Sequence, residues 1–199
     1  MSYFCDVSDV VASQSLNGIL MNRNVGQYRI FGTMASLAFF STDKNFRAEA
    51  NYTFMNPQDL DKIGSDEPLR IGDIPAHQFN LNASYRVITD NGFLGVAAIR
   101  TNYVGKRPVG PETSQKDNPG LMGSGFYPQY FVVNGSVTLS HNKLSGLSLQ
   151  MTVNNILDQL HYHPGPRTAA ANYTNRVNDF VNYVPQRGRH LFIKAMYRF

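Results

Sequence analysis

Apolar and polar residues alternate along several stretches of this chain, most clearly at its C-terminus. From residue 191 to residue 199 the odd-numbered positions are all apolar, while the even-numbered positions include Lys194 and Arg198. Because successive side chains of a strand point to opposite faces, this alternation predicts a strand with one apolar face. A strand of about 9–11 residues with such a face is long enough to cross a bilayer within a barrel. A terminal strand of a soluble sandwich shows the same pattern, so this stretch alone leaves both interpretations open.

The alternation recurs upstream and predicts about eight strands. It is regular over 46–54, 79–87, 131–139 and 147–153, and weaker over 13–21, 28–40 and 93–104. A brief turn is expected at 22–26, where Asn and Gly cluster. We therefore predict an all-β, antiparallel fold in a single domain over residues 1–199.

The connections between these predicted strands alternate in length. Three are short, at 41–45, 89–92 and 141–146, and three are long, at 55–76, 105–128 and 155–187. Transmembrane barrels have short periplasmic turns and longer extracellular loops, whereas a soluble sandwich has no reason to sort its loops in this way. The alternation therefore favours a transmembrane β-barrel.

The two faces of the predicted sheet differ in chemistry. Polar side chains such as Arg47, Glu49 and Gln150 would each need a partner in a dry core, but not on the inner wall of a hydrated barrel. We expect the apolar residues between such positions to share one convex surface of a curved, open and twisted sheet, with an unpaired edge near 13–21. They are Phe79, Leu81, Ala83, Tyr85, Leu147, Leu149, Met151, Val153, Leu191, Ile193 and Tyr197.

Composition narrows the alternatives further. Charged residues make up 16% of the chain, and 11 Tyr and 13 Phe accompany a mean hydropathy of −0.30. No apolar run approaches the ~18 residues of a membrane helix. The single Cys5 excludes an internal disulfide, and a net charge of +4 spread over scattered basic residues gives no support to nucleic-acid binding. Residues 1–25 show no export signal, although an outer-membrane protein must be exported. Either the membrane interpretation is wrong, or the chain is the tail of a longer protein.

Several short motifs occur in a fixed order along the chain. They are Ala48-Glu-Ala-Asn-Tyr-Thr-Phe54, Ile74-Pro-Ala-His77 leading into Asn80-Leu-Asn-Ala-Ser-Tyr-Arg86, Thr152-Val-Asn-Asn-Ile-Leu-Asp158, Pro185-Gln-Arg-Gly-Arg189 and Tyr197-Arg-Phe199. Their order and spacing resemble the C-terminal part of a TonB-dependent outer-membrane receptor, over most of residues 25–199. Met34 departs from the family pattern, which commonly has an acidic residue there.

The resemblance implies a barrel of 22 strands around an N-terminal plug, of which this chain holds about eight strands and no plug. The parent protein would bind a siderophore, cobalamin or a glycan in the outer membrane of a Gram-negative bacterium and import it with energy from the TonB system, through the missing plug. Outer-membrane lipid would surround it, and the barrel assembly machinery would read Tyr197 and Phe199. We expect no cofactor and no enzymatic activity. The alternative is a complete small eight-stranded barrel with a structural, adhesive or enzymatic role.

The long connections carry the candidate ligand-binding residues, which are Lys106, Arg107, His161, Tyr162, His163 and Arg167. We expect His161 and His163, one residue apart, to point to opposite sides of a strand, with no third metal ligand nearby. The sequence therefore predicts no metal site, and ordinary loop packing is the simpler interpretation of this stretch. No arrangement of nucleophile and base is present, so no catalytic residue is assigned.

Overall fold

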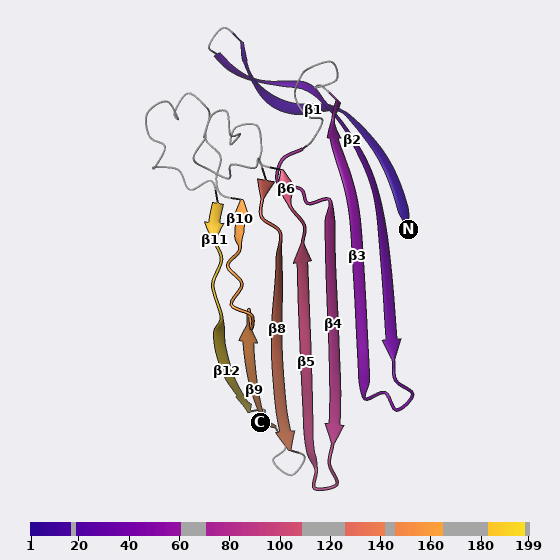
Figure 1. Cartoon of the computed structure of the whole chain (residues 1–199), viewed down its shortest axis with the longest axis vertical. Helices are drawn as coiled ribbons and strands as arrows, with labels where there is room; N and C mark the ends of the chain where they lie inside the picture. The colour runs from indigo at the N-terminus through magenta and orange to yellow at the C-terminus, as the bar shows by residue number, and fades with distance from the viewer. Residues whose placement is uncertain (17–18, 61–70, 109–125, 142–145, 165–182, 198–199) are drawn as a thin grey trace.

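The computed structural model describes residues 1–16, 19–60, 71–108, 126–141, 146–164 and 183–197, with the backbone alone at 10–16, 19–25 and 183. Eight strands form one antiparallel sheet, in chain order (Figure 1). They are β1 (Ser2–Leu16), β2 (Ile19–Phe40), β3 (Phe46–Asp59), β4 (His77–Ile88), β5 (Phe93–Val104), β8 (Tyr130–His141), β9 (Leu147–Asn154) and β12 (His190–Tyr197). The predicted all-β, antiparallel, eight-stranded sheet is confirmed.

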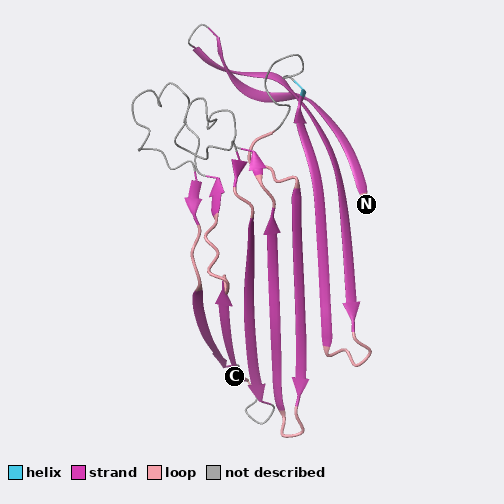
Figure 2. Ribbon diagram, in the orientation of Figure 1, coloured by secondary structure: helices cyan, strands magenta, loops and turns pink. Residues whose placement is uncertain are grey.

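The sheet is open, because β1 and β12 are its two edges and do not pair with each other. Long strands run side by side as a curved wall, and the two short hairpins stand apart from it at one end (Figure 2). The first hairpin is β6 (Arg107–Pro108) with β7 (Phe126–Tyr127). The second is β10 (Tyr162–Pro164) with β11 (Tyr183–Pro185).

Short and long connections start from opposite ends of this wall, as the alternation of loop lengths predicts (Figure 1). The turns at 41–45 and 89–92 lie at one end, and β8 and β9 also meet there. β3, β5 and β9 end at the other end of the wall, where both short hairpins also lie (Figure 1). We call these the turn end and the loop end of the sheet.

The N-terminal part differs from the prediction. Residues 22–26 belong to β2 instead of forming a turn, and they pair with β1 through partners such as Asn22 with Ser13 and Asn24 with Val11. The tip of this hairpin lies between Leu16 and Ile19, so the free edge of the sheet is β1 as a whole. Asn and Gly favour turns only locally, and the backbone ladder with β1 overrides that preference.

Apolar residues form a continuous surface on one face of the sheet. Residues directly opposite each other on antiparallel strands share a face, and the register joins Tyr85, Ala97, Val137, Met151 and Ile193 in one row. A neighbouring row joins Ala83, Ile99, Gly135, Val153 and Leu191. All eleven residues predicted to share a face do so.

The opposite face is polar and concave. Side chains from β2 through β9 line a single hollow of about 1020 Å³ on this face, among them Arg47, Glu49 and Gln150. A smaller hollow of about 450 Å³ lies on the apolar face. Because the hollow on the polar face is more than twice as large, we take the polar face as the concave one and the apolar face as the convex one. Among the described residues, none lies in a helix long and apolar enough to cross a membrane.

Candidate functional site

A buried arginine lies at the centre of the loop end. Arg107 is 5% exposed, and its guanidinium lies over the rings of Tyr127 and Tyr130, at 5.3 and 5.6 Å from their centroids. Its Nη2 donates a hydrogen bond to the backbone carbonyl of Tyr162, 55 residues away in the chain. Arg107 therefore joins the β6–β7 hairpin, the start of β8 and the β10–β11 hairpin.

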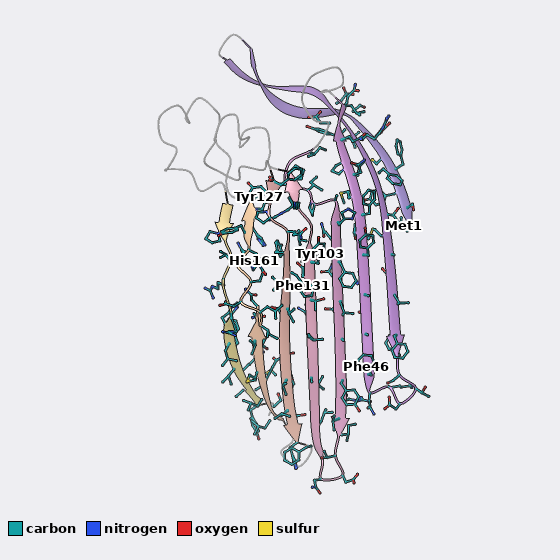
Figure 3. All side chains as sticks on the ribbon, in the orientation of Figure 1. Met1, Phe46, Tyr103, Tyr127, Phe131 and His161 are labelled. Carbon is teal, nitrogen blue, oxygen red and sulfur yellow. The ribbon has the colours of Figure 1, made fainter. Side chains whose placement is uncertain are left out.

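The two histidines of the last long connection pack on the same tyrosine. The ring centroids of His161 and His163 lie 4.8 and 6.1 Å from that of Tyr130, and 6.0 Å from each other. The Tyr130 hydroxyl also lies 3.4 Å from Nε2 of His163. Figure 3 labels His161 and Tyr127, which both lie toward the loop end.

Our expectation that the two histidines point to opposite sides was wrong. Residues i and i+2 of a strand lie on the same face, because side chains alternate with a period of two. His161 and His163 therefore converge on Tyr130. Even so, no group of three His, Cys, Asp or Glu side chains among the described residues is arranged to hold a metal ion.

The surroundings of His163 favour its neutral form. Partial burial is the largest cause, followed by the positive charges of Arg107 and His161, and together they lower the pKa of the His163 imidazole from its usual 6.5. On His161, Nδ1 lies 3.0 Å from the carbonyl oxygen of Gln159. The cluster thus presents one buried guanidinium, two histidine rings and two tyrosine rings.

The remaining sequence candidates lie elsewhere. Lys106 is exposed, although its neighbour Arg107 is buried. Tyr197 lies on the apolar face, opposite Leu147, and is 61% exposed. Arg167 and Phe199 lie outside the described residues. The structure thus brings together Arg107, His161, Tyr162 and His163, with Tyr127 and Tyr130 as partners that sequence reasoning did not single out.

A second element missed from sequence is the corner after β9. Asn155 is 2% exposed, and its backbone has a φ of 51°. Its side chain donates to the carbonyls of Gln159 and Arg187 and accepts from the Gln159 amide, while its own amide donates to Oδ1 of Asn134. These four hydrogen bonds join β8, the end of β9 and the residues just before β12.

Asp158 completes this corner. Its Oδ1 accepts a hydrogen bond of 2.7 Å from the amide of Arg189. A Cβ on Gly188 would lie 2.7 Å from the same oxygen, so a larger residue would displace the carboxylate. The motifs 152–158 and 185–189, which carried part of the family resemblance, thus contact each other directly at the entry to β12.

Aromatic residues lie in two zones of the convex face. Near the loop end, the register aligns Tyr52, Phe79, Tyr103 and Phe131 in one row across four strands, and Figure 3 shows Tyr103 and Phe131 on neighbouring strands. Near the turn end, two ring pairs occur, Phe39 with Phe46 and Phe93 with His141, at centroid distances of 6.0 and 4.4 Å. The apolar residues between these zones form a band.

Comparison with known proteins identifies the fold. Residues 3–156 match the model of the family described as TonB dependent receptor-like, beta-barrel. No curated protein sequence matches the chain.

Three solved structures illustrate the structural likeness. The FrpB iron transporter of Neisseria meningitidis is similar with a TM-score of 0.68 at 17% identity, over 100% of this chain and 28% of that one. The ferric yersiniabactin uptake receptor FyuA of Yersinia pestis has a TM-score of 0.67 at 12% sequence identity, and the match covers 100% of this chain and 27% of that one. The ferric-catecholate import receptor Fiu of E. coli K12, in its closed form, has a TM-score of 0.62 at 21% sequence identity, and the match covers 97% of this chain and 24% of that one.

The chain spans about a quarter of the length of these structures. The family match covers most of the sequence, and the open, antiparallel sheet corresponds to part of a larger barrel. The chain therefore belongs to the TonB-dependent receptor β-barrel family.

Proposed function

We propose that residues 1–199 form the C-terminal part of the barrel of an outer-membrane receptor, which takes up a scarce ligand with energy from the TonB system. The observation that carries this proposal is the apolar band between the two aromatic zones. From Phe93 to Tyr103 on β5 the chain advances about 34 Å along the strand. At a strand tilt of about 40°, this corresponds to about 26 Å along the membrane normal. The apolar band of outer-membrane barrels is about 25 Å tall and flanked by aromatic girdles.

The open edges support a fragment over a complete small barrel. A closed barrel has no edge strands, whereas β1 and β12 leave two here. In the parent receptor these edges would pair with the other strands of a 22-stranded barrel, and the plug would connect it to TonB. We expect no TonB-dependent uptake from residues 1–199 expressed alone behind an export signal.

The loop end is the surface that we propose for ligand contact. Arg107, His161, Tyr162 and His163 lie together there, with Lys106 exposed beside them, and Arg167 follows on the same connection. The names of the similar structures refer to ferric siderophores and to iron, which favours a ferric siderophore over cobalamin or a glycan. An enzymatic role has no supporting arrangement among the described residues.

The membrane part of the proposal is tested with two adjacent residues on opposite faces. Leu149 is 47% exposed on the convex face, whereas Gln150 lines the polar hollow. Arginine on the lipid face costs about 2–4 kcal/mol at the bilayer midplane, so Leu149→Arg in the parent receptor should reduce the folded, heat-modifiable outer-membrane form. Gln150→Arg should leave it near the wild-type level. Equal loss from both substitutions would overturn the assignment of faces.

The assembly signal is tested at the C-terminus. We propose that Tyr197 and Phe199 are read by the barrel assembly machinery, because both belong to the apolar set of the last strand. Phe199→Asp should lower the outer-membrane level of the parent receptor more than Arg198→Asp does. Wild-type levels of the Phe199→Asp receptor in a heat-modifiability assay would contradict this role.

A further inference from the structure

The imidazole rings of His161 and His163, which both pack on Tyr130, lie near the separation that two ligands of one metal ion require. Two rings that bind one ion at roughly tetrahedral angles, with metal–nitrogen distances of about 2.0–2.1 Å, have centroids about 5 Å apart. The centroids of His161 and His163 are 6.0 Å apart, so a small side-chain rotation closes the difference. Both rings belong to the same short segment around β10. Metal binding would therefore require no rearrangement of the sheet.

The hydrogen bonds around these rings leave metal-binding nitrogens available. His161 Nδ1 faces the carbonyl oxygen of Gln159 at 3.0 Å, and a carbonyl accepts only from a protonated nitrogen. That contact places the lone pair on Nε2, and it matches the second-shell arrangement that orients histidine ligands in metal sites. His163 Nε2 has a tyrosine hydroxyl at 3.4 Å, a long contact that a metal ion would readily replace.

We propose that His161 and His163 form a two-histidine site for a divalent transition cation such as Cu²⁺, Ni²⁺ or Zn²⁺. Imidazole nitrogen suits these borderline ions, unlike Ca²⁺ or Mg²⁺, which prefer oxygen ligands. Two protein ligands leave the other coordination positions to water or to the donor atoms of a chelator.

Arg107 determines which form of the ion fits best. It is buried, its Nε has no hydrogen-bond partner among the described residues, and no carboxylate forms an ion pair with it there. Arg107, His161 and His163 all pack on Tyr130, and a positive charge beside the two rings favours anionic oxygens over a bare cation. The site therefore fits a metal ion whose remaining positions are held by an anionic chelator, with the chelator oxygens directed toward Arg107.

This inference adds coordination chemistry to the loop surface, and only its relevance to uptake rests on the proposed function. Metal binding itself is measured on the full 199-residue chain in detergent micelles, with no membrane, plug or TonB present. Failure of metal binding would therefore leave the receptor assignment intact, and failure of uptake by the parent receptor would leave the metal site intact.

The test uses Cu²⁺ alone, followed by electron paramagnetic resonance, in a Cys5→Ser background because Cys5 is an exposed free thiol. We expect one bound Cu²⁺ with nitrogen couplings from two imidazoles. His161→Gln and His163→Gln should each remove one nitrogen coupling and weaken binding at least about tenfold, the loss that even an outer-shell substitution can cause. Unchanged circular dichroism would establish that the variants fold.

The chain offers three matched controls, because its other histidines are His77, His141 and His190. Their glutamine variants should retain the affinity and both couplings. Equal Cu²⁺ affinity of the wild type and the His161→Gln/His163→Gln double variant would overturn the proposal, as would loss of binding in His141→Gln. A second titration supplies Cu²⁺ as its citrate complex. Arg107→Gln should lower the affinity for the citrate complex more than the affinity for free Cu²⁺, and an equal loss of both affinities would overturn the chelator assignment.

Discussion

The two ends of the sheet hold their connections together in different ways. At the turn end, most bonds are local: Asp43 accepts hydrogen bonds from the amide and side chain of Asn45, two residues away. Thr89 accepts one from the amide of Phe93, and Gly92 supplies a φ of 84°. At the loop end, Arg107 and Tyr162 are 55 residues apart. The turn end thus relies mainly on bonds within each turn, with the bonds from Arg86 to Asn45, 41 residues apart, as an exception. The loop end is joined by bonds between distant segments.

This difference has an energetic consequence. Closing a longer loop costs more conformational entropy. A contact between distant segments must therefore offset a larger entropic cost than a contact within a turn. At the loop end, single residues also join several segments, as Asn155 does for β8 and the entry to β12. Substitutions there should have larger effects than substitutions in the turns.

The largest effect is expected at Asn155. Asn155→Ala removes three side-chain hydrogen bonds at a residue that is 2% exposed. Alanine also lacks the polar side chain that lets asparagine adopt a positive φ, here 51°, through local hydrogen bonds. We expect the free energy of unfolding to fall by roughly 2–4 kcal/mol, measured by urea titration in detergent micelles. Asn155→Gly relieves the backbone but loses the same hydrogen bonds, so wild-type stability in that variant would contradict the role of the side chain.

A smaller effect is expected at Arg107, with its neighbour as the control. Arg107→Ala removes the bond to the Tyr162 carbonyl and the packing on Tyr127. We expect faster amide hydrogen exchange at Tyr162 and His163, by about tenfold or more, since a hydrogen bond from a charged group is worth about 1.5–3 kcal/mol. Lys106→Ala should leave exchange unchanged, because Lys106 is exposed. Similar protection in both variants would show that Arg107 does not hold the two hairpins together.

The turn end was also the easier part to predict from sequence. Asn91-Gly92 is a local hairpin signal, and the strict alternation over 79–87 assigns each residue to a face without knowledge of its partners. Local rules failed at 22–26, where Asn and Gly suggested a turn but thirteen residue pairs hold β1 and β2 together. There, pairing between strands outweighed the preference of single residues.

The candidate site was only partly predictable for the same reason. His161, His163 and Arg107 stand out as basic loop residues, but nothing local indicates that a tyrosine at the start of β8 brings them together. His161 and His163 were assigned to opposite sides by a misapplied rule, since a period of two predicts the shared side that the structure shows. Asn155 had a signal in its motif, yet its partner Arg187 lies 32 residues further on.

The smallest effect is expected in the turn at 41–45, and its pH dependence identifies the cause. Asp43 accepts hydrogen bonds from the side chain of Ser41 and from Asn45, which lower the pKa of its carboxyl from the usual 3.8. A depressed folded-state pKa means that the ionised carboxylate stabilises the fold above pH 3.8, and that this contribution is lost as the pH falls through the folded-state pKa. Asp43→Asn should therefore lower the urea midpoint slightly at pH 7, with a difference from wild type that shrinks toward pH 3.

The second short turn supplies the control for this measurement. Asp90 lies at the same end of the sheet, is exposed, and makes no side-chain hydrogen bond to the described residues. Asp90→Asn should therefore leave the urea midpoint at its wild-type value at pH 7. A difference between Asp43→Asn and wild type that stays constant from pH 7 to pH 3 would show that the carboxylate charge does not stabilise the turn. The effect would then come from the shape of the side chain alone, and the turn end would rest on backbone geometry more than on its local hydrogen bonds.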